Sequence, residues 1–580
     1  ALHGINLCLD IVGTDVVWRN VLLRLGYTKT EANAFIAGPA FQAWWLMNNL
    51  EGWGGPNSDA WYSQRERLQK QILKRMKELG IHACLPGYSG MVPHDAHERL
   101  GLNVADPGLW NGYRRPAFLL PTDPRFAEIA ALYYKEQQRL YGKVDFYSMD
   151  PFHEGGSVKD VDLRAAGEAI MREMKRVNPA AVWVAQSWQE CPYPDMISSL
   201  HNGDMLVLDI NSETQPQWGD PDSSWKRVDG FSGHDWAFCM LLNFGGNVGM
   251  YGKLQHVIDE YYKARDSRFA TKLRGVGLTM EGIDNNPVMY ELVTELPWRQ
   301  HRFDWQEWLR GYVTARYGAA ANAKVQEAWL LLARSVYGAS AKVAEQGCHE
   351  SVLCARPALD VYQVSSWSMM EEYYNPDDVI RAARLMVEAS HEMPANANFR
   401  YDLVDVTRQA IAEQARLVYD EVVAAYRAKD RRMFAHASQR FLDILLQQDR
   451  LLSSMPGFMV GSWIGQARAL GTTADERDRY EWNARVQITT WGNREAAERG
   501  RLREYAHKEW SGVLRDFYYP RWKAYFETLA ATFDGRPMQP IDFYAMDEKW
   551  TLQHNAYPCT AQGDAVEFAQ ETFRKVFDTE

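Results

Sequence analysis

The chain has 580 residues, and 64 Lys and Arg against 75 Asp and Glu give it a formal net charge of −11 at pH 7. Because its basic residues form no concentrated cluster, nucleic acid and anionic membrane surfaces are disfavoured as partners. The longest apolar run, Trp236 to Leu242, is far shorter than the ~18 residues of a membrane span. Seven cysteines without a CxxC pair favour neither a disulfide framework nor a structural zinc site.

The N-terminal residues enter an apolar, strand-like stretch, Gly4 to Leu9, almost at once. They lack the charged and apolar regions of a signal peptide, so we expect any signal peptide to lie upstream of Ala1. The location that we expect for the protein is secreted or periplasmic. No N-x-[ST] sequon occurs, which disfavours a heavily glycosylated eukaryotic secretory protein.

Residues 1–300 alternate short apolar runs with amphipathic stretches, a pattern typical of βα units around a parallel sheet. Helical patterns at Ala60 to Leu79 and Asp123 to Tyr141 each end at a glycine. We predict an α/β fold of the (β/α)8 TIM-barrel type, with the first βα unit expected upstream. The alternative, an open doubly wound sheet, would bring a phosphate loop that Gly13-Thr14-Asp15 does not resemble. The expected strands are Ile5 to Val12, His82 to Leu85, Val144 to Met149, Val182 to Ser187, Met205 to Ile210, Ala237 to Leu242 and Leu273 to Thr279.

Residues 301–580 change to a helical pattern, predicting an all-α domain that packs against the barrel. Apolar residues recur at helical spacing between Val404 and Tyr426. Further helical patterns are Ala321 to Val336, Asp377 to Glu392, Met433 to Leu452, Asp475 to Trp491 and Arg501 to Phe517.

Several generic catalytic motifs are missing from the sequence. It contains no HExxH, no GxSxG and no GxxxxGK[ST], so zinc hydrolases, serine hydrolases and P-loop enzymes lose support. The 22 Trp and 29 Tyr fit either an ordinary core or a sugar-binding cleft, where flat rings face C–H groups.

Two glutamates follow expected strands at the edge where barrel enzymes carry their active sites. Glu154 lies in Asp150-Pro-Phe-His-Glu-Gly-Gly156, and Glu281 lies in Thr279-Met-Glu-Gly-Ile-Asp284. Paired carboxylates across a barrel mouth are what a glycosidase needs, one to attack and one to protonate the leaving oxygen. Asp209, Glu213 and Asp284 compete for these roles, and a salt bridge or helix-start charge is the alternative reading of any one glutamate.

Long ordered motifs resemble glycoside hydrolase family 89, the α-N-acetylglucosaminidases. In the first half they are Gly38-Pro-Ala-Phe-Gln-Ala-Trp44, Met47-Asn-Asn-Leu50, the Glu154 and Glu281 segments, Leu208-Asp209, Glu213-Thr-Gln-Pro216 and Trp236 to Asn247. In the second half they are Phe399-Arg-Tyr-Asp-Leu403, Gly461-Ser-Trp463, Thr490-Trp-Gly492 and Tyr518-Tyr-Pro-Arg-Trp522. The resemblance covers nearly the whole chain.

The resemblance implies an exo-acting, retaining enzyme that removes terminal α-linked N-acetylglucosamine from glycans without metal or cofactor. By resemblance to the family's motifs, Glu154 corresponds to the general acid/base and Glu281 to the nucleophile. The implied substrate-binding residues are Trp44, Met47, His153, Trp188, Leu241, Phe244, Trp491 and Tyr505, with Trp110 a weaker candidate. His153 departs from the Asn of some members, and the loop between Trp491 and Tyr505 is longer here.

Three alternatives stay open from the sequence. The chain could be another exo-N-acetylhexosaminidase, although the adjacent Asp-Glu pair of substrate-assisted enzymes does not follow any expected strand. It could be a non-catalytic, sugar-binding relative. The glycan could be of mucin type or derived from a glycosaminoglycan.

Overall fold

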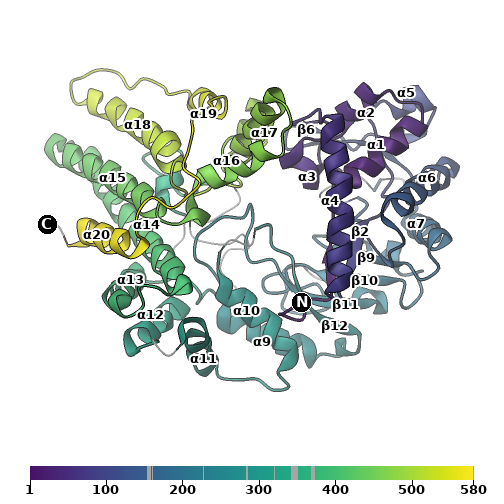
Figure 1. Ribbon diagram of the computed structural model, residues 1–580, viewed down its shortest axis with the longest axis horizontal. Helices are drawn as coiled ribbons and strands as arrows, with labels where there is room; N and C mark the ends of the chain where they lie inside the picture. The colour runs from purple at the N-terminus through teal and green to yellow at the C-terminus, as the bar shows by residue number, and fades with distance from the viewer. Residues whose placement is uncertain are drawn as a thin grey trace.

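The computed structural model describes residues 1–152, 154, 158–159, 161–225, 227–282, 285–318, 321–340, 350–366 and 373–578. Two parts lie side by side in Figure 1, with the mixed α/β part in purple to teal and the helical part in green to yellow. Helices α16 (Val460–Ala469) and α17 (Ala474–Gln487) belong to the helical part, and α17 contacts the turn at Pro39–Phe41, which leads into α3 (Gln42–Leu46) of the other part. The two parts therefore share an extended boundary.

A curled, seven-stranded parallel sheet forms the centre of the first part and confirms the predicted fold class. Each of the seven expected strands is present, with ends that differ by up to three residues. The order in the sheet is β1 (Leu7–Leu9), β2 (His82–Pro86), β8 (Phe146–Ser148), β9 (Val182–Ser187), β10 (Met205–Asp209), β11 (Asp235–Met240) and β12 (Leu273–Leu278).

The two outer strands of the sheet, β1 and β12, have no pairing with each other among the described residues. Leu9 at the end of β1 is 48% exposed, whereas the strands in the middle bury most of their side chains. β1 pairs with β2 from Leu7 to Leu9, so it is shorter than the expected Ile5 to Val12.

The helices of the first part cover the sheet in βα order. Ser58 accepts a hydrogen bond from the Trp61 N–H at the start of α4 (Asp59–Glu78), and Asp123 caps α6 (Pro124–Tyr141) through the Arg125 N–H. Helices α4 and α6 confirm the helices predicted at Ala60 to Leu79 and Asp123 to Tyr141. The others are α1 (Thr14–Arg24), α2 (Lys29–Phe35), α5 (Ala96–Leu100), α7 (Leu163–Val177), α8 (Pro194–Ile197), α9 (Leu254–Arg265) and α10 (Pro287–Glu295).

Short strands between β2 and α6 form two small antiparallel sheets that the sequence patterns do not predict. One joins β3 (Met91–Val92), β7 (Ala117–Leu119) and β4 (Val104–Ala105), and the other is the hairpin of β5 (Leu109–Trp110) and β6 (Tyr113–Arg114). The hairpin contacts the helical part, since the Tyr113 hydroxyl donates to the Trp491 carbonyl at 3.1 Å.

The second part is helical, as predicted. Its longest helix, α14 (Ala397–Arg427), has 31 residues and packs against α13 (Pro376–Ala389), α15 (Arg431–Leu452) and α20 (Ala565–Phe577). The remaining helices are α11 (Trp305–Tyr317), α12 (Ala323–Arg334), α18 (Tyr519–Thr532) and α19 (Phe543–Thr551). Among the described residues, no helix combines the length and the apolar character needed to cross a bilayer.

The helix predicted from Arg501 to Phe517 is wrong. Residues 501–511 form turns and irregular backbone, followed by a π-helical turn at Leu514–Tyr518. Arg501 and Glu504 have φ of 60° and 56°, which a right-handed helix cannot contain. Buried Glu504 pairs with Arg521 at 2.5 Å, so a tertiary ion pair fixes the backbone that the apolar spacing assigns to a helix.

Candidate active site

The two predicted glutamates follow strands β8 and β12, which three other strands separate in the sheet. Because the sheet is parallel and curled, both segments leave it at the same edge and face each other. The negative charge of Glu154 lies close enough to contribute to raising the pKa of Glu281 and of Tyr505. The structure therefore brings these two carboxylates and one phenol into a single site.

Glu281 is held by donors from both halves of the chain. Its carboxylate accepts the Gly245 N–H at 2.6 Å and the Tyr505 hydroxyl at 2.9 and 2.7 Å. Its side chain is solvent-accessible, yet protein surrounds it closely enough that burial is the main cause of a raised pKa. The two hydrogen bonds and the ammonium of Lys508 act in the opposite sense and favour the ionised form.

The loop that presents the Gly245 N–H is itself held by the helical half. The Lys508 ammonium donates to the carbonyls of Gly245, at 3.0 Å, and Gly246. Gly245 has φ of 60°, and a Cβ there would lie 1.9 Å from the Tyr505 carbonyl oxygen. Only glycine suits this position, where the loop and the segment of Tyr505 come together.

Glu154 is held through the barrel half. The Asn49 amide donates to its Oε2 at 2.7 Å, and the Arg115 guanidinium donates to its backbone carbonyl at 2.5 Å. Glu154 has φ of 46°, a left-handed conformation that is uncommon outside glycine. Buried Arg115 and Asn49 thus support a strained residue and orient its side chain.

Trp491 is the centre of an aromatic cluster at the boundary between the two parts, and it has no exposed surface. Its ring lies edge-on to Trp44, with centroids 4.8 Å apart, and to Tyr505, at 6.3 Å. The rest of the cluster is Phe41, Trp110 and Tyr113. Trp491 therefore supports two half-buried aromatic residues, one from each half, rather than presenting its own face to solvent.

The other predicted substrate-binding residues lie at or near the carboxyl ends of the strands. Trp188 is half-buried directly after β9, and its ring is 6.0 Å from that of Phe244, which follows β11 together with Leu241. Met47 is half-buried two residues before Asn49. His153, and Asp284 among the competitors, lie outside the described residues.

The competing carboxylates Asp209 and Glu213 hold backbone in place. Asp209 accepts the N–H groups of Gln217 and Trp218, and Glu213 accepts those of Leu241 and Leu242. Both are buried, and burial raises the pKa of each to about 7. Their bonds organise the loops that follow β10 and β11.

Reasoning from the sequence does not identify Asn49, Arg115 or Lys508 as site residues. Asn49 belongs to one of the motifs that carry the family resemblance, which is the one signal available for it. Arg115 follows a hairpin too short for a periodic pattern, and Lys508 lies in the segment wrongly predicted as a helix.

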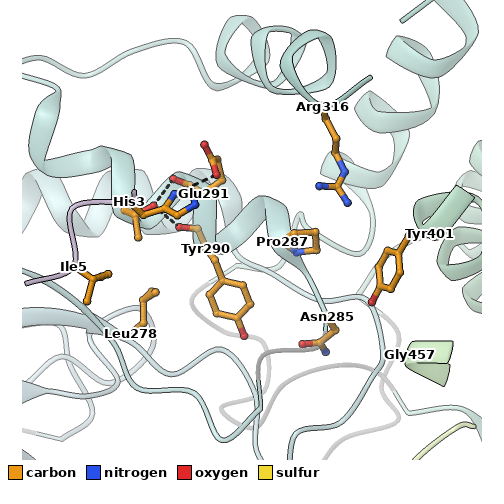
Figure 2. Close-up of a pocket in the computed structure, with 11 residues that line it drawn as sticks. His3, Ile5, Leu278, Asn285, Pro287, Tyr290, Glu291, Arg316, Tyr401 and Gly457 are labelled. Carbon is orange, nitrogen blue, oxygen red and sulfur yellow. Dashed lines mark hydrogen bonds and ion pairs between the residues drawn. The ribbon is translucent and has the colours of Figure 1, made fainter. Parts of the chain in front are cut away.

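A cavity of about 550 Å³ lies elsewhere, between the outer strands and the helical part (Figure 2). None of its lining residues is a predicted site residue. It adjoins the Glu281 segment through Tyr290, whose hydroxyl donates to the Gly282 carbonyl at 3.1 Å.

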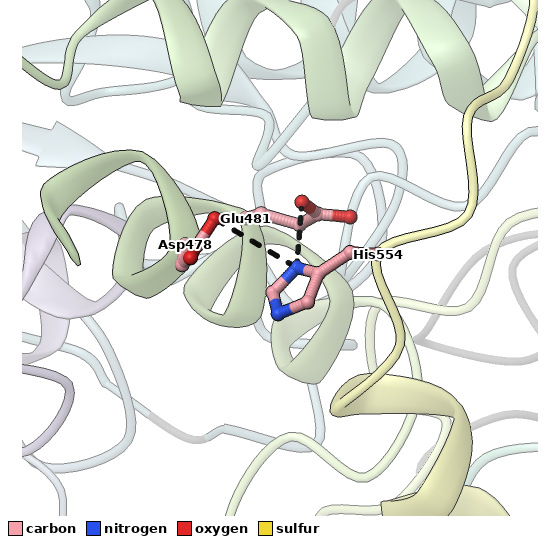
Figure 3. A group of neighbouring side chains, drawn as sticks. All are labelled: Asp478, Glu481 and His554. Carbon is pink, nitrogen blue, oxygen red and sulfur yellow. Dashed lines mark hydrogen bonds and ion pairs between the residues drawn. The ribbon is translucent and has the colours of Figure 1, made fainter. Parts of the chain in front are cut away.

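One group of side chains has the composition of a metal site, with the ligand atoms of Asp478, Glu481 and His554 within 4.8 Å of one another (Figure 3). Both carboxylates are already paired with arginines. Arg468 contacts Asp478 at 3.0 Å and Glu481 at 2.5 Å, and Arg485 contacts Glu481 at 2.7 Å. Since two positive charges offset the two negative ones, this group is an ion-pair network joining α17 to the segment after α19.

Comparison with known proteins gives consistent matches for both parts. Residues 1–300 match the sequence profile of the α-N-acetylglucosaminidase (NAGLU) TIM-barrel domain, and residues 308–575 match the profile of the NAGLU C-terminal domain. The α-N-acetylglucosaminidase of Homo sapiens is 34% identical over 601 residues, covering 100% of this chain and 78% of the relative.

Solved structures of the family 89 glycoside hydrolase from Clostridium perfringens are similar throughout. The complex with PUGNAc has a TM-score of 0.93 and 32% identity, covering 98% of this chain and 65% of that one. A variant with two glutamates replaced by glutamine, bound to its substrate GlcNAc-α-1,4-galactose, gives the same values. This chain spans about two thirds of the length of these solved chains. With both halves matched by profiles and by structures, the chain belongs to the α-N-acetylglucosaminidase family, glycoside hydrolase family 89.

Proposed function

We propose that this protein is an exo-acting, retaining glycoside hydrolase that removes terminal α-linked N-acetylglucosamine from glycans. The observation that carries the proposal is the pair of glutamates, Glu154 and Glu281. They follow separate strands of the sheet, and the negative charge of each contributes to raising the pKa of Tyr505. The names of its relatives support the reaction, and a relative's complex with GlcNAc-α-1,4-galactose supports the substrate class.

The proposed roles follow from the hydrogen bonds of each carboxylate. Glu281 accepts from two donors, the Gly245 N–H and the Tyr505 hydroxyl, and has the Lys508 ammonium nearby, so its ionised form is stabilised for attack on the anomeric carbon. Glu154 gives its proton to the glycosidic oxygen as that bond breaks. This forms a β-linked glycosyl-enzyme, and water that loses a proton to Glu154 then displaces Glu281. Such direct attack needs carboxyl groups roughly 5 to 6 Å apart.

Attack by the substrate's own acetamido group is the chemical alternative to an enzyme nucleophile. In an α-linked N-acetylglucosamine, that group lies on the same face as the leaving oxygen, so it cannot displace it from behind. Hydrolysis with retention at this linkage therefore needs a nucleophile from the protein, and we assign that role to Glu281.

The proposed sugar-binding residues come from both domains, which we assign as a catalytic barrel at residues 1–300 and a helical domain at 301–580. Trp44, Met47, Trp188, Leu241 and Phe244 belong to the barrel, as does His153. Tyr505 belongs to the helical domain, and Trp491 supports it together with Trp44. The proposal extends to mucin-type or glycosaminoglycan-derived chains and to a secreted or periplasmic location, where such glycans are presented.

Hydrolysis of aryl glycosides tests the proposed function. The panel comprises α- and β-linked N-acetylglucosamine and N-acetylgalactosamine with the same aryl group. We expect release of the aryl alcohol from the α-GlcNAc compound, with the others at least ~100-fold slower because a misplaced linkage or hydroxyl disturbs the transition state. Faster hydrolysis of a β-linked compound would replace the proposal with a β-hexosaminidase, and no hydrolysis of any compound would favour a non-catalytic sugar-binding protein.

The Tyr505→Phe variant is expected to move the acid limb of the kcat/KM profile to higher pH. The Tyr505 hydroxyl stabilises ionised Glu281, so its removal raises the pKa of a carboxyl that must be ionised to react. A hydrogen bond to a charged group corresponds to a shift of about one pH unit. The measurement is kcat/KM for the aryl α-GlcNAc glycoside between pH 4 and 9.

Tyr290→Phe is the matched control for this variant. It also removes a hydroxyl beside the Glu281 segment, but that hydroxyl donates to the Gly282 carbonyl instead of the carboxylate. We expect its acid limb to coincide with that of the wild type. Equal shifts in the two variants would mean that the effect comes from the loop and not from the bond to Glu281.

A further inference from the structure

Asn49 and Arg115 are two buried polar residues in contact with the proposed acid/base, and neither takes part in the roles described above. Asn49 has no exposed surface and Arg115 is 4% exposed. Asn49 lies shortly after α3, and Arg115 immediately follows the β5–β6 hairpin. Two separate segments of the barrel domain therefore meet at Glu154.

The orientation of the Asn49 amide is determined from both of its ends. Its Oδ1 faces the Arg115 guanidinium, with an Nη1 to Oδ1 distance of 3.4 Å, and its Nδ2 donates to Glu154 Oε2 at 2.7 Å. A guanidinium can only donate hydrogen bonds. A flipped amide would place its NH2 group against the guanidinium and its oxygen against the carboxylate, which are two repulsive contacts.

We infer that Arg115 and Asn49 are positioning residues that keep Glu154 Oε2 an acceptor, so that Glu154 carries its catalytic proton on Oε1. The unprotonated, carbonyl-type oxygen of a carboxyl group is the stronger acceptor, so the Asn49 donor favours the proton on Oε1, and Arg115 prevents the flip that would remove this donor. Arg115 also donates to the Glu154 carbonyl, so the strained backbone and the side chain are held by one guanidinium. This inference rests on the proposed function and specifies which oxygen performs the proton transfer.

The hairpin links this arrangement to the helical domain. Tyr113, two residues before Arg115, donates to the Trp491 carbonyl, and a Cβ on Gly492 would lie 1.8 Å from the Tyr113 hydroxyl. The close contact fixes the hairpin against the segment that carries Trp491. The helical domain thus positions Glu281 through Tyr505 and Lys508, and Glu154 through the hairpin.

Substitution of Asn49 tests the inference, because it should change how strongly kcat/KM depends on the leaving group of the substrate. The enzymes are wild type, Asn49→Ala and Asn49→Asp, and the substrates are α-GlcNAc glycosides of dinitrophenol, nitrophenol and phenol. A good leaving group needs little help from an acid. We expect kcat/KM of Asn49→Ala to fall by about 10- to 100-fold on the phenyl glycoside and by less than about threefold on the dinitrophenyl glycoside.

The pH profile gives a second readout that a purely structural role would not move. The amide donor favours the ionised carboxylate, so its loss is expected to move the alkaline limb of kcat/KM to higher pH. Among the residues that the structure describes, the charged or titratable groups facing Glu154 are Arg115, Glu281 and Tyr505, and all three are unchanged in the variant. Asn49→Asp has the same shape and keeps an acceptor for Arg115, but it adds a negative charge beside Glu154. If Asn49→Ala does not fold, the dependence of Asn49→Asp on the leaving group, and not its pH profile, tests the inference.

Asn48→Gly is the matched control. It removes the neighbouring amide, which contacts Ser89, and its φ of 62° suits glycine. Equal losses on all three glycosides, or Asn49 variants that behave as Asn48→Gly does, would overturn the inference. Wild-type protein that hydrolyses none of the α-GlcNAc glycosides would instead overturn the proposed function, so the two failures are distinguishable.

Discussion

Replacing Glu281 by glutamine is expected to lower kcat on every α-GlcNAc glycoside by about four to six orders of magnitude, the range seen when a covalent nucleophile is lost. A neutral amide cannot form the glycosyl ester, whatever the leaving group. The fold should persist, because the amide oxygen can still accept from the Gly245 N–H and the Tyr505 hydroxyl. The unfolding temperature is therefore expected to stay within ~3 °C of the wild type.

The Glu291→Gln variant is the control for this loss. It makes the same chemical change at a glutamate that lines the cavity in Figure 2 and lies 3.5 Å from His3. We expect wild-type kcat and KM. If Glu281→Gln retained more than about 1% of wild-type kcat, the carboxylate would not be the nucleophile.

Replacing Glu154 by glutamine is expected to give a loss that depends on the leaving group. With phenyl α-GlcNAc, kcat/KM should fall by about 10²- to 10⁴-fold, the usual contribution of a general acid. With the dinitrophenyl glycoside, the first step should remain fast while hydrolysis of the glycosyl-enzyme becomes slow, because no base activates water. Rapid mixing should then show a burst of phenolate, and mass spectrometry should find the sugar on the peptide that contains Glu281.

Added azide shows which glutamate is the nucleophile and which is the acid/base. A small anion needs no general base, so it should restore turnover of Glu154→Gln and give the α-glycosyl azide, formed from a β-linked intermediate. Restoration in Glu281→Gln with the α-azide as product would show that the roles of the two glutamates are reversed, because that product again requires a β-linked intermediate. The β-azide from Glu281→Gln would mean that azide has taken the place of the missing nucleophile, in agreement with the assignment.

The sheet was predictable because parallel strands buried on both faces form short, continuous apolar runs. Val182–Ser187 has the same ends in the prediction and the structure, and Met205–Asp209 differs by one residue. The outer strand Leu7–Leu9 is shorter than the predicted Ile5 to Val12, because its pairing with β2 runs only from Leu7 to Leu9. The small strands of the β5–β6 hairpin carry only two residues each, too few for any periodic signal.

The site was partly predictable for a different reason. The rule that function gathers at the carboxyl ends of parallel strands leads to Glu154 and Glu281, and the structure brings them together. It does not lead to Arg115 or Lys508, which reach the site through a hairpin and an irregular segment. That segment was predicted as a helix because apolar spacing does not reveal a buried ion pair such as that of Glu504 with Arg521.

The most direct test of the proposed mechanism is the configuration of the first product, followed by proton NMR during hydrolysis of an aryl α-GlcNAc glycoside. The anomeric proton distinguishes the two forms of N-acetylglucosamine before they interconvert in solution. Two displacements, the first by Glu281 and the second by water, predict that the α-anomer appears first and the β-anomer only later by mutarotation. Appearance of the β-anomer first would show a single displacement by water and would contradict direct attack by Glu281.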